Sequence, residues 1–290
     1  MPHRRQFLTT AATALSGASV FGVAPATAAS VPCVSTRDHF DENGTLTPEN
    51  TARSYDTTSD VPVVDTDCVS DLTVFVHGWD KSGSDPEQRA LDKITTADTE
   101  LTENGYDGAA VGYTWDSDKG DGLDFGWDVA QGIAQRNGRK LAQFALDVKR
   151  SCPETTLRFV SHSLGAQVAF SALRTLNDRS AWGSLDTTIQ TVHPLGAATD
   201  NDVPTKETGR ATYDAIKAQT GSVYNYHNAA DDVLQWAYGT IEFDDALGET
   251  GVESDDTPPA NYTDRDVESQ VGDDHSNYLN TVADDVLGDM

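Results

Sequence analysis

The stretch Thr156-Leu-Arg-Phe-Val-Ser-His-Ser163-Leu-Gly165-Ala-Gln-Val-Ala-Phe170 decides the fold of this 290-residue chain. Its first six residues have the composition of a buried strand, and a helical apolar pattern follows from Leu164 to Leu176. A serine between a strand and a helix lies on a strained turn that lifts its hydroxyl above the sheet. Ser161 and Gly165, two residues to either side, are small enough for that crowded turn. The spacing therefore predicts that Ser163 is a nucleophile, with an ordinary helix cap as the alternative.

Strands and helices are predicted to alternate on both sides of this stretch. Such alternation predicts an α/β fold with a mostly parallel sheet and helices on both faces. Ligands bind beyond the carboxyl ends of the strands in sheets of this kind. The predicted strands are 72–76, 108–115, 156–161, 188–192 and 222–226, and the predicted helices are 86–103, 128–150, 164–176, 232–239 and 276–287.

Two segments differ in composition from this alternating domain, which is predicted to span residues 70–290. Residues 29–69 are rich in Thr, Ser, Asp and Pro with little periodicity, and they predict an irregular N-terminal arm. Residues 242–274 contain twelve acids and one arginine. They predict an acidic, solvated insertion, with a substrate lid or a calcium site as weaker alternatives.

A serine nucleophile needs a base, because its hydroxyl reacts weakly at neutral pH. Its partners follow it in the order acid, then histidine. Of the seven histidines only His275 lies beyond every predicted strand, in a polar loop that opens the last helix, although a surface helix cap is the alternative. The acid is expected after a late strand, where Asp231 and Asp232 precede a helix. Asp231 is the first choice, Asp232 the second and Asp200 the third.

The oxyanion that forms during acyl transfer needs hydrogen-bond donors. Val76-His-Gly-Trp79, at the end of the first predicted core strand, offers the backbone N–H of Trp79, and the start of the next helix offers that of Leu164. His77 is interpreted as a packed core residue without a direct role. Trp79, Trp115 and Trp236 either line an acyl pocket or belong to the core. This chemistry requires no metal or organic cofactor.

These motifs, in this chain order, resemble the α/β-hydrolase family over roughly residues 70–287, and within it the secreted lipases and esterases of halophilic archaea. Val74-Phe-Val-His-Gly-Trp-Asp is similar to the oxyanion strand and loop of the family, and Val160-Ser-His-Ser-Leu-Gly to its nucleophile elbow. Tyr113-Thr-Trp-Asp and the following helix resemble a further lipase segment. Ser161 stands where the family usually has Gly. The segment 242–274 has no counterpart in the resemblance. The resemblance therefore predicts neither the lid nor the substrate.

The N-terminus predicts an export signal over residues 1–28. Arg4-Arg5 followed by Gln-Phe-Leu resembles the twin-arginine class, and Ala26-Thr-Ala28 is the predicted cleavage site. The middle of this segment contains too many Thr and Ser to be a good membrane span. We therefore expect a secreted protein without a stable membrane anchor. Its three cysteines, Cys33, Cys68 and Cys152, permit one disulfide and one free thiol, but the pairing does not follow from the sequence.

The charge excludes two classes of partner. With 47 acidic and 20 basic residues the net charge is −27, so the chain repels nucleic acid phosphates and anionic membranes. Most of its acids are Asp and it has few Lys, a surface typical of proteins from salt-saturated habitats, where high salt screens self-repulsion. A merely acidic secreted protein is the alternative.

Together these patterns predict a secreted serine hydrolase that cleaves carboxylic esters of small molecules or lipids. A non-catalytic secreted binding module on the same fold is the alternative from another class. Amide hydrolysis by the same three residues is a further alternative, because both reactions use the same acyl chemistry. Acyl chain length, calcium dependence and oligomeric state do not follow from the sequence.

Overall fold

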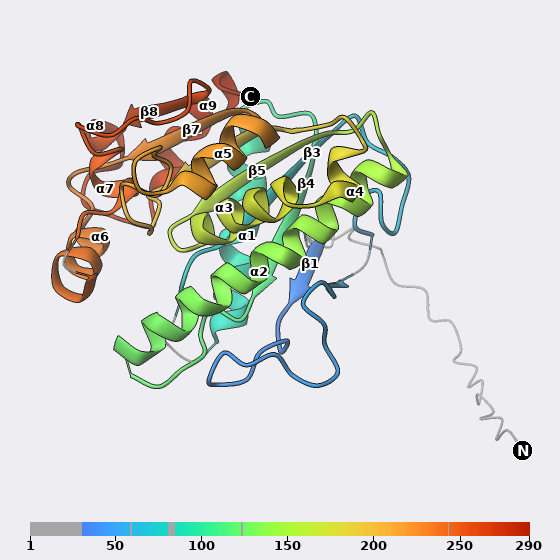
Figure 1. Ribbon diagram of the computed structural model, residues 1–290, viewed down its shortest axis with the longest axis horizontal. Coiled ribbons are helices and arrows are strands. Elements are labelled where there is room, and N and C mark those ends of the chain that lie inside the picture. Colours follow the sequence, from blue (N-terminus) through green and yellow to red (C-terminus); the bar gives the residue numbers. More distant parts are fainter. Residues whose placement is uncertain (1–30, 59, 81–84, 123, 243) are drawn as a thin grey trace, which may run out of the picture. The chain divides into compact units, whose positions relative to one another are not determined.

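An eight-stranded sheet forms the centre of the described part of the chain (Figure 1). The computed structural model describes residues 31–58, 60–80, 85–122, 124–242 and 244–290. The predicted export signal, residues 1–28, lies outside these ranges. The strands follow one another in the sheet in the order β2-β1-β4-β3-β5-β6-β7-β8. They are β1 (Cys33–Thr36), β2 (Asp56–Thr57), β3 (Asp71–Val76), β4 (Ala109–Trp115), β5 (Thr156–His162), β6 (Ile189–Leu195), β7 (Thr220–His227) and β8 (Tyr262–Asp266).

All neighbouring strands in this sheet are parallel except the antiparallel pair β1 and β2. The carboxyl ends of β3 and β5 therefore lie at the same edge, where Val76 pairs with Ser161. The loops that follow these two strands contain the predicted oxyanion and nucleophile motifs. The α/β fold with a mostly parallel sheet that the sequence predicts is confirmed.

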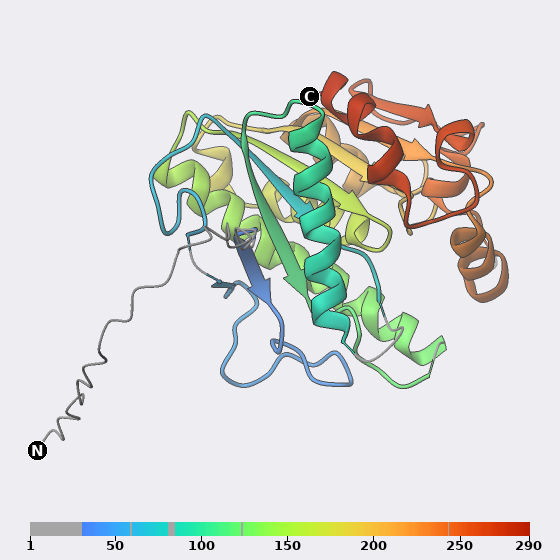
Figure 2. The same ribbon diagram turned by 180° about the vertical axis from the view of Figure 1, so that it is seen from behind.

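Helices cover both faces of the sheet. The described helices are α1 (Pro86–Glu103), α2 (Asp124–Ser151), α3 (Gly165–Asn177), α4 (Ser180–Gly183), α5 (Arg210–Gln219), α6 (Asp232–Ala237), the π-helix η1 (Tyr238–Glu242), α7 (Leu247–Thr250), α8 (Glu268–Val271) and α9 (Tyr278–Gly288). Figure 1 shows α2, α3 and α5 on the near face, and Figure 2 shows α1 and α9 on the other.

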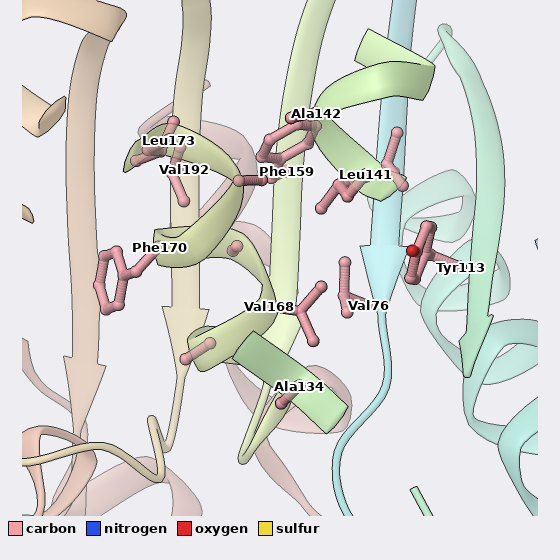
Figure 3. Close-up of a cluster of buried hydrophobic side chains, with 14 of the residues drawn as sticks. Val76, Tyr113, Ala134, Leu141, Ala142, Phe159, Val168, Phe170, Leu173 and Val192 are labelled. Atoms are coloured by element: carbon pink, nitrogen blue, oxygen red, sulfur yellow. The ribbon is translucent and has the colours of Figure 1, made fainter. Parts of the chain in front are cut away.

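Side chains that alternate along the strands divide the core between these two faces. Val76 of β3 packs toward α2 and α3, where Figure 3 shows it beside Val168, in the same cluster as Phe159 and Leu141. Phe75, the residue before Val76, belongs to the core on the opposite face, under α1 and α9. Each such buried side chain contributes about 1.5–3 kcal/mol to folding. Both faces of β3 are thus held in place, which fixes the loop after it.

The predicted irregular arm is wrong for residues 33–36, which form β1 and pair in parallel with β4. This strand is too short and too polar to stand out in the sequence. Further along the arm, Thr51 and Ser54 are tied to α2 by the buried Lys140, whose Nζ donates to their carbonyl oxygens at 2.7 and 2.8 Å. The arm is therefore part of the packed domain.

The acidic segment 242–274 is not simply an insertion, because its residues 262–266 form β8 and extend the sheet beside β7. α5 is another element that the sequence analysis did not predict. Cys68 and Cys152 form a disulfide that joins the end of the arm to the end of α2, while Cys33 is free and buried. In the described residues, no helix is long and apolar enough to cross a membrane.

Candidate active site

Ser163 lies between the last residue of β5 and the first residue of α3. Its φ is +54°, a left-handed conformation that costs a non-glycine residue about 1–3 kcal/mol. Its N–H donates to the carbonyl of Leu195 at 3.0 Å, and its own carbonyl accepts from the N–H groups of Ala166 and Ala198. The end of β6 and the start of α3 thus hold the strained turn in place. This is the geometry expected of a nucleophile elbow.

Two glycines allow the chain to pack closely around Ser163. A Cβ on Gly165 would lie 2.4 Å from the carbonyl oxygen of Val76, so α3 begins directly against the end of β3. A Cβ on Gly78 would lie 2.6 Å from Cβ of Ser163. The loop after β3 therefore lies directly beside the serine.

That loop contains both His77 and Trp79. His77 is fully buried: its Nδ1 donates to the carbonyl of Gly78 and its Nε2 accepts from the N–H of Trp115. Burial lowers its pKa to about 3, so it is neutral, in agreement with its interpretation as a packed core residue. Within the described part of the chain, the backbone N–H groups of Trp79 and Leu164 have no acceptor. Both donors predicted for an oxyanion are thus unpaired.

The three tryptophans that were considered for an acyl pocket have different environments. Trp115 is fully buried in the core and Trp236 is exposed on α6. Trp79 is half-buried, and its ring lies edge-on against Trp127, with 5.3 Å between the ring centroids. Trp127 in turn donates to Glu242 of η1 at 2.6 Å. Of the three, Trp79 directly follows Gly78, which packs against Ser163.

His275 and Asp231 are brought together across 44 residues of sequence. Nδ1 of His275 donates to Oδ2 of Asp231 at 2.7 Å, and the carboxylate is completely buried. This bond fixes the tautomer in which Nε2 of His275 has a free lone pair. Nε2 is itself buried and has no hydrogen-bond partner in the described ranges. The imidazole is therefore oriented by an acid and has an unpaired acceptor, as a general base requires.

Asp231 is held by four donors. Its Oδ1 accepts from the N–H groups of Val233 and Leu234, so it caps α6, and its Oδ2 accepts from His275 and from the hydroxyl of Tyr278 at 3.0 Å. The second choice for the acid, Asp232, is exposed in the first turn of α6.

Asp200, the third choice for the acid, forms a bridge with Ala246. Among the described contacts, neither Asp232 nor Asp200 reaches His275.

His162 and Tyr278 are two neighbours of His275 that the sequence did not single out. The His162 ring lies 4.6 Å from the His275 ring, and its Nε2 donates to the carbonyl of His275 at 2.8 Å. Because His162 directly precedes Ser163, this contact places the His275 loop against the nucleophile turn. Burial and the nearby His275 lower the pKa of His162 well below its usual value, so it stays neutral.

Tyr278 opens α9 only three residues after His275. Burial, followed by the charge of Asp231, raises its pKa, so its hydroxyl stays protonated and donates to the carboxylate. In the sequence, only the short separation of Tyr278 from His275 points to this tyrosine. That separation does not show that its hydroxyl contacts Asp231.

No group of three or more His, Cys, Asp or Glu in the described residues is arranged to hold a metal ion.

The chain matches a family model described as an alpha/beta hydrolase of unknown function (DUF900) over residues 57–235. It is also similar in structure to the crystal structure of the esterase domain from a Rhodothermus marinus protein, with 14% identity and a TM-score of 0.39. That similarity covers 81% of this chain and 92% of the other. No curated protein matches the chain.

Proposed function

The chain belongs to this alpha/beta hydrolase family of unknown function, and on that premise we propose that it is a serine hydrolase that cleaves carboxylic esters. Ser163 is the proposed nucleophile, His275 the base and Asp231 the acid that orients the base. The proposed oxyanion donors are the backbone N–H groups of Trp79 and Leu164.

One observation carries this proposal. The His275 imidazole is fixed by Asp231 at 2.7 Å, leaves its Nε2 unpaired, and lies against the turn that contains the strained Ser163. A surface helix cap would need neither the buried carboxylate nor the contact with His162. Strain of this kind persists where the surroundings hold it in place, and it gathers at reactive sites.

The first half of the proposed reaction forms an acyl-enzyme. Nε2 of His275 takes the proton of the Ser163 hydroxyl while the oxygen attacks the acyl carbon. The buried Asp231 carboxylate stabilises the resulting imidazolium. The two backbone N–H groups bind the tetrahedral oxyanion, and each contributes about 3 kcal/mol. When the intermediate collapses, His275 gives its proton to the departing alcohol oxygen.

The second half releases the acid. His275 takes a proton from water, and the hydroxide oxygen attacks the acyl carbon of the ester on Ser163. The second tetrahedral intermediate uses the same donors. Its collapse returns the proton from His275 to Ser163 and frees the carboxylic acid. His162 supports both halves because it is neutral and so adds no positive charge beside the imidazolium.

The test combines covalent labelling with turnover. We expect a fluorophosphonate to label wild-type protein once, at Ser163, and p-nitrophenyl esters to be hydrolysed. Ser163→Ala should lose both the label and the turnover. Ser161→Ala is the matched control, since Oγ of this buried serine has no hydrogen-bond partner in the described ranges.

Two results would contradict the proposal. Full activity in Ser163→Ala would exclude this mechanism, and the absence of labelling in folded wild-type protein would favour a non-catalytic binding module. Esters of graded chain length, with matched amides beside them, would then define the substrate. Faster cleavage of the amides would replace the ester proposal with amide hydrolysis.

Export by the twin-arginine route also belongs to this proposal. It rests on the sequence of residues 1–28. N-terminal sequencing of protein from the culture medium should find a start just after Ala28. Intact Met1 in the secreted fraction would exclude cleavage of this signal.

A further inference from the structure

A large cavity lies on the outer side of α2 and α3, away from the serine turn. Its volume is about 1320 Å³, and it is bounded by the arm, α2, α3 and the start of α5. Ser171 is the first α3 residue that lines it, eight residues beyond Ser163, which corresponds to roughly 12 Å along the helix. The arm wall is fixed by the contacts of the buried Lys140. The cavity is therefore a built feature of the fold, separate from the proposed active site.

Positive charge is concentrated in this cavity, although the chain has a net charge of −27. The lining contains two carboxylates, Asp178 and Asp214, and Asp214 is already paired with Arg210 at 2.9 Å. Five arginines line the cavity, namely Arg53, Arg136, Arg139, Arg174 and Arg179.

These five arginines have no carboxylate within 4.0 Å among the described residues, in a chain with 47 acids. Three of them donate to uncharged acceptors instead: Arg136 to the carbonyl of Gly44, Arg174 to Oγ1 of Thr212, and Arg179 to Oε1 of Gln143. Five arginines elsewhere each have a carboxylate partner within 4.0 Å, namely Arg37, Arg89, Arg158, Arg210 and Arg265. The cavity is thus lined by arginine side chains whose positive charges no carboxylate neutralises within 4.0 Å in the described residues.

Among these arginines, Arg179 has a buried donor that no described residue satisfies. Its Nη1 is buried and has no hydrogen-bond partner in the part of the chain described. Burial lowers its pKa, and the positive charges of Arg53 and Arg150 lower it further. A buried donor without a partner costs free energy, and like charges held together add to that cost. An anionic ligand would remove both penalties.

We propose that this cavity binds a polyvalent oxyanion, a ligand with several phosphate or carboxylate groups. The guanidinium group is a planar fork of donors that fits both groups in a bidentate manner. Arg136 and Arg139 lie about one helical turn apart on α2, opposite Arg174 on α3, so more than one anionic group is contacted at once. The cavity is also larger than the usual 300–1,000 Å³ of a small-ligand site, which favours an extended ligand.

The test is calorimetric titration of the whole protein with inorganic tripolyphosphate and, separately, with citrate. Both titrations are made at the lowest ionic strength at which circular dichroism shows folded protein, with NaCl to match the ionic strength. We expect one ligand per chain. Tighter binding of tripolyphosphate assigns phosphate chemistry to the site, and tighter binding of citrate assigns carboxylate chemistry.

Variants locate the binding. The double variant Arg139→Gln with Arg174→Gln should weaken binding by at least about tenfold, since it removes two charged donors. Asp178→Asn should strengthen binding, because it removes a negative charge from the lining. Arg265→Gln is the control for the single variant Arg139→Gln: it also removes one positive charge, on β8 and away from the cavity, and should leave the affinity unchanged.

Three outcomes would overturn the proposal: no heat with either anion, equal affinity in the wild type and the double variant, or equal weakening in Arg265→Gln. The exposed Arg139→Gln alone serves as the second variant if the double variant does not fold. Because the readout is binding, the result does not depend on whether Ser163 is a nucleophile.

Discussion

At the residue scale, Asp231 has two roles that can be separated by experiment. One carboxylate oxygen caps α6, and the other accepts from His275 and Tyr278. Asparagine caps helices as well as aspartate does, but it cannot stabilise an imidazolium. Changing this residue to asparagine therefore affects the chemistry much more than the helix.

We predict that Asp231→Asn lowers kcat by about 10⁴-fold, because it removes the charge that orients and stabilises the base. The free energy of unfolding should fall by no more than about 1–3 kcal/mol, since the cap is retained and only the hydrogen bonds of Oδ2 are lost. Ester turnover and urea unfolding measure the two effects. The control is Asp232→Asn, which should keep its turnover. A comparable loss in Asp232→Asn would show that the wrong carboxylate has been chosen.

We propose that Tyr278 is a positioning residue that acts through Asp231. Tyr278→Phe removes a hydrogen bond to a buried carboxylate, a loss of about 1–3 kcal/mol. We expect kcat to fall roughly tenfold while KM stays the same, because the hydroxyl contacts the acid rather than the substrate. Steady-state kinetics separates the two constants. Tyr213→Phe on α5 is the matched control, and a change in KM alone would contradict this role.

The residues of the site differ in how far the sequence reveals them. Ser163, Asp231 and His275 stand out because each follows a recognisable strand or opens a helix, and parallel strands bring such loops to one edge. His162 and Tyr278 make contacts that depend on how α9 packs against β5, and no local pattern encodes that packing. The choice of Asp231 over Asp232 is likewise decided by which carboxylate faces the interior.

At the element scale, the contact of α3 with β3 positions both the proposed nucleophile and the predicted oxyanion donors. Gly165 permits this contact, because a side chain there would collide with the carbonyl oxygens of Val76 and His77. Neither collision partner is a flexible side-chain end. The helix must therefore move if this glycine is replaced.

We predict that Gly165→Ala lowers the free energy of unfolding by about 1–3 kcal/mol, the usual cost of overpacking. It should also slow fluorophosphonate labelling, because the shift moves Ser163. Urea unfolding and labelling rates measure the two effects. The control is Gly183→Ala in α4, where a Cβ meets nothing within 4 Å. An unchanged labelling rate in Gly165→Ala would mean that the contact does not position the serine.

Elements with long apolar runs were predictable, and short or polar ones were not. β3 and β5 show in the sequence because both faces of these strands are buried. The sequence of β8 is Tyr-Thr-Asp-Arg-Asp, without an apolar run. It forms a strand because its backbone pairs with that of β7. The disulfide between Cys68 and Cys152 likewise depends on where the arm ends in space.

At the scale of the whole molecule, the net charge of −27 predicts that salt stabilises the fold. The Debye length falls to about 3 Å at 1 M salt, which screens repulsion among the carboxylates. The free energy of unfolding should rise as KCl increases from about 0.2 M to about 4 M. Chemical unfolding in urea measures this. A flat or falling trend would exclude adaptation to high salt.

Buried histidines add a dependence on pH. Burial lowers the pKa of His193 to about 3, whereas the unfolded chain has the usual value near 6.5. The unfolded state therefore binds a proton first, so stability is complete above pH 6.5 and is lost as the pH falls toward 3. From about pH 7 to about pH 5, His193 alone should remove about 2 kcal/mol.

His193→Gln tests this contribution. The fall in unfolding free energy between these two pH values should be about 2 kcal/mol smaller in the variant than in the wild type. Any stability that the variant loses through poorer packing is the same at both pH values, so it does not affect this difference. Equal slopes would mean that this histidine is not kept neutral by burial.

The two edge strands of the sheet are built in a way that limits aggregation between copies of the protein. A sheet that does not close leaves free backbone groups at its outermost strands, and another chain can add a strand there. At one end β2 is only two residues long, and at the other β8 exposes charged side chains including Arg265 and Asp266. A short strand offers little to pair with, and charged side chains repel an identical strand. The acid-rich segment that contains β8 thus protects an open edge against aggregation.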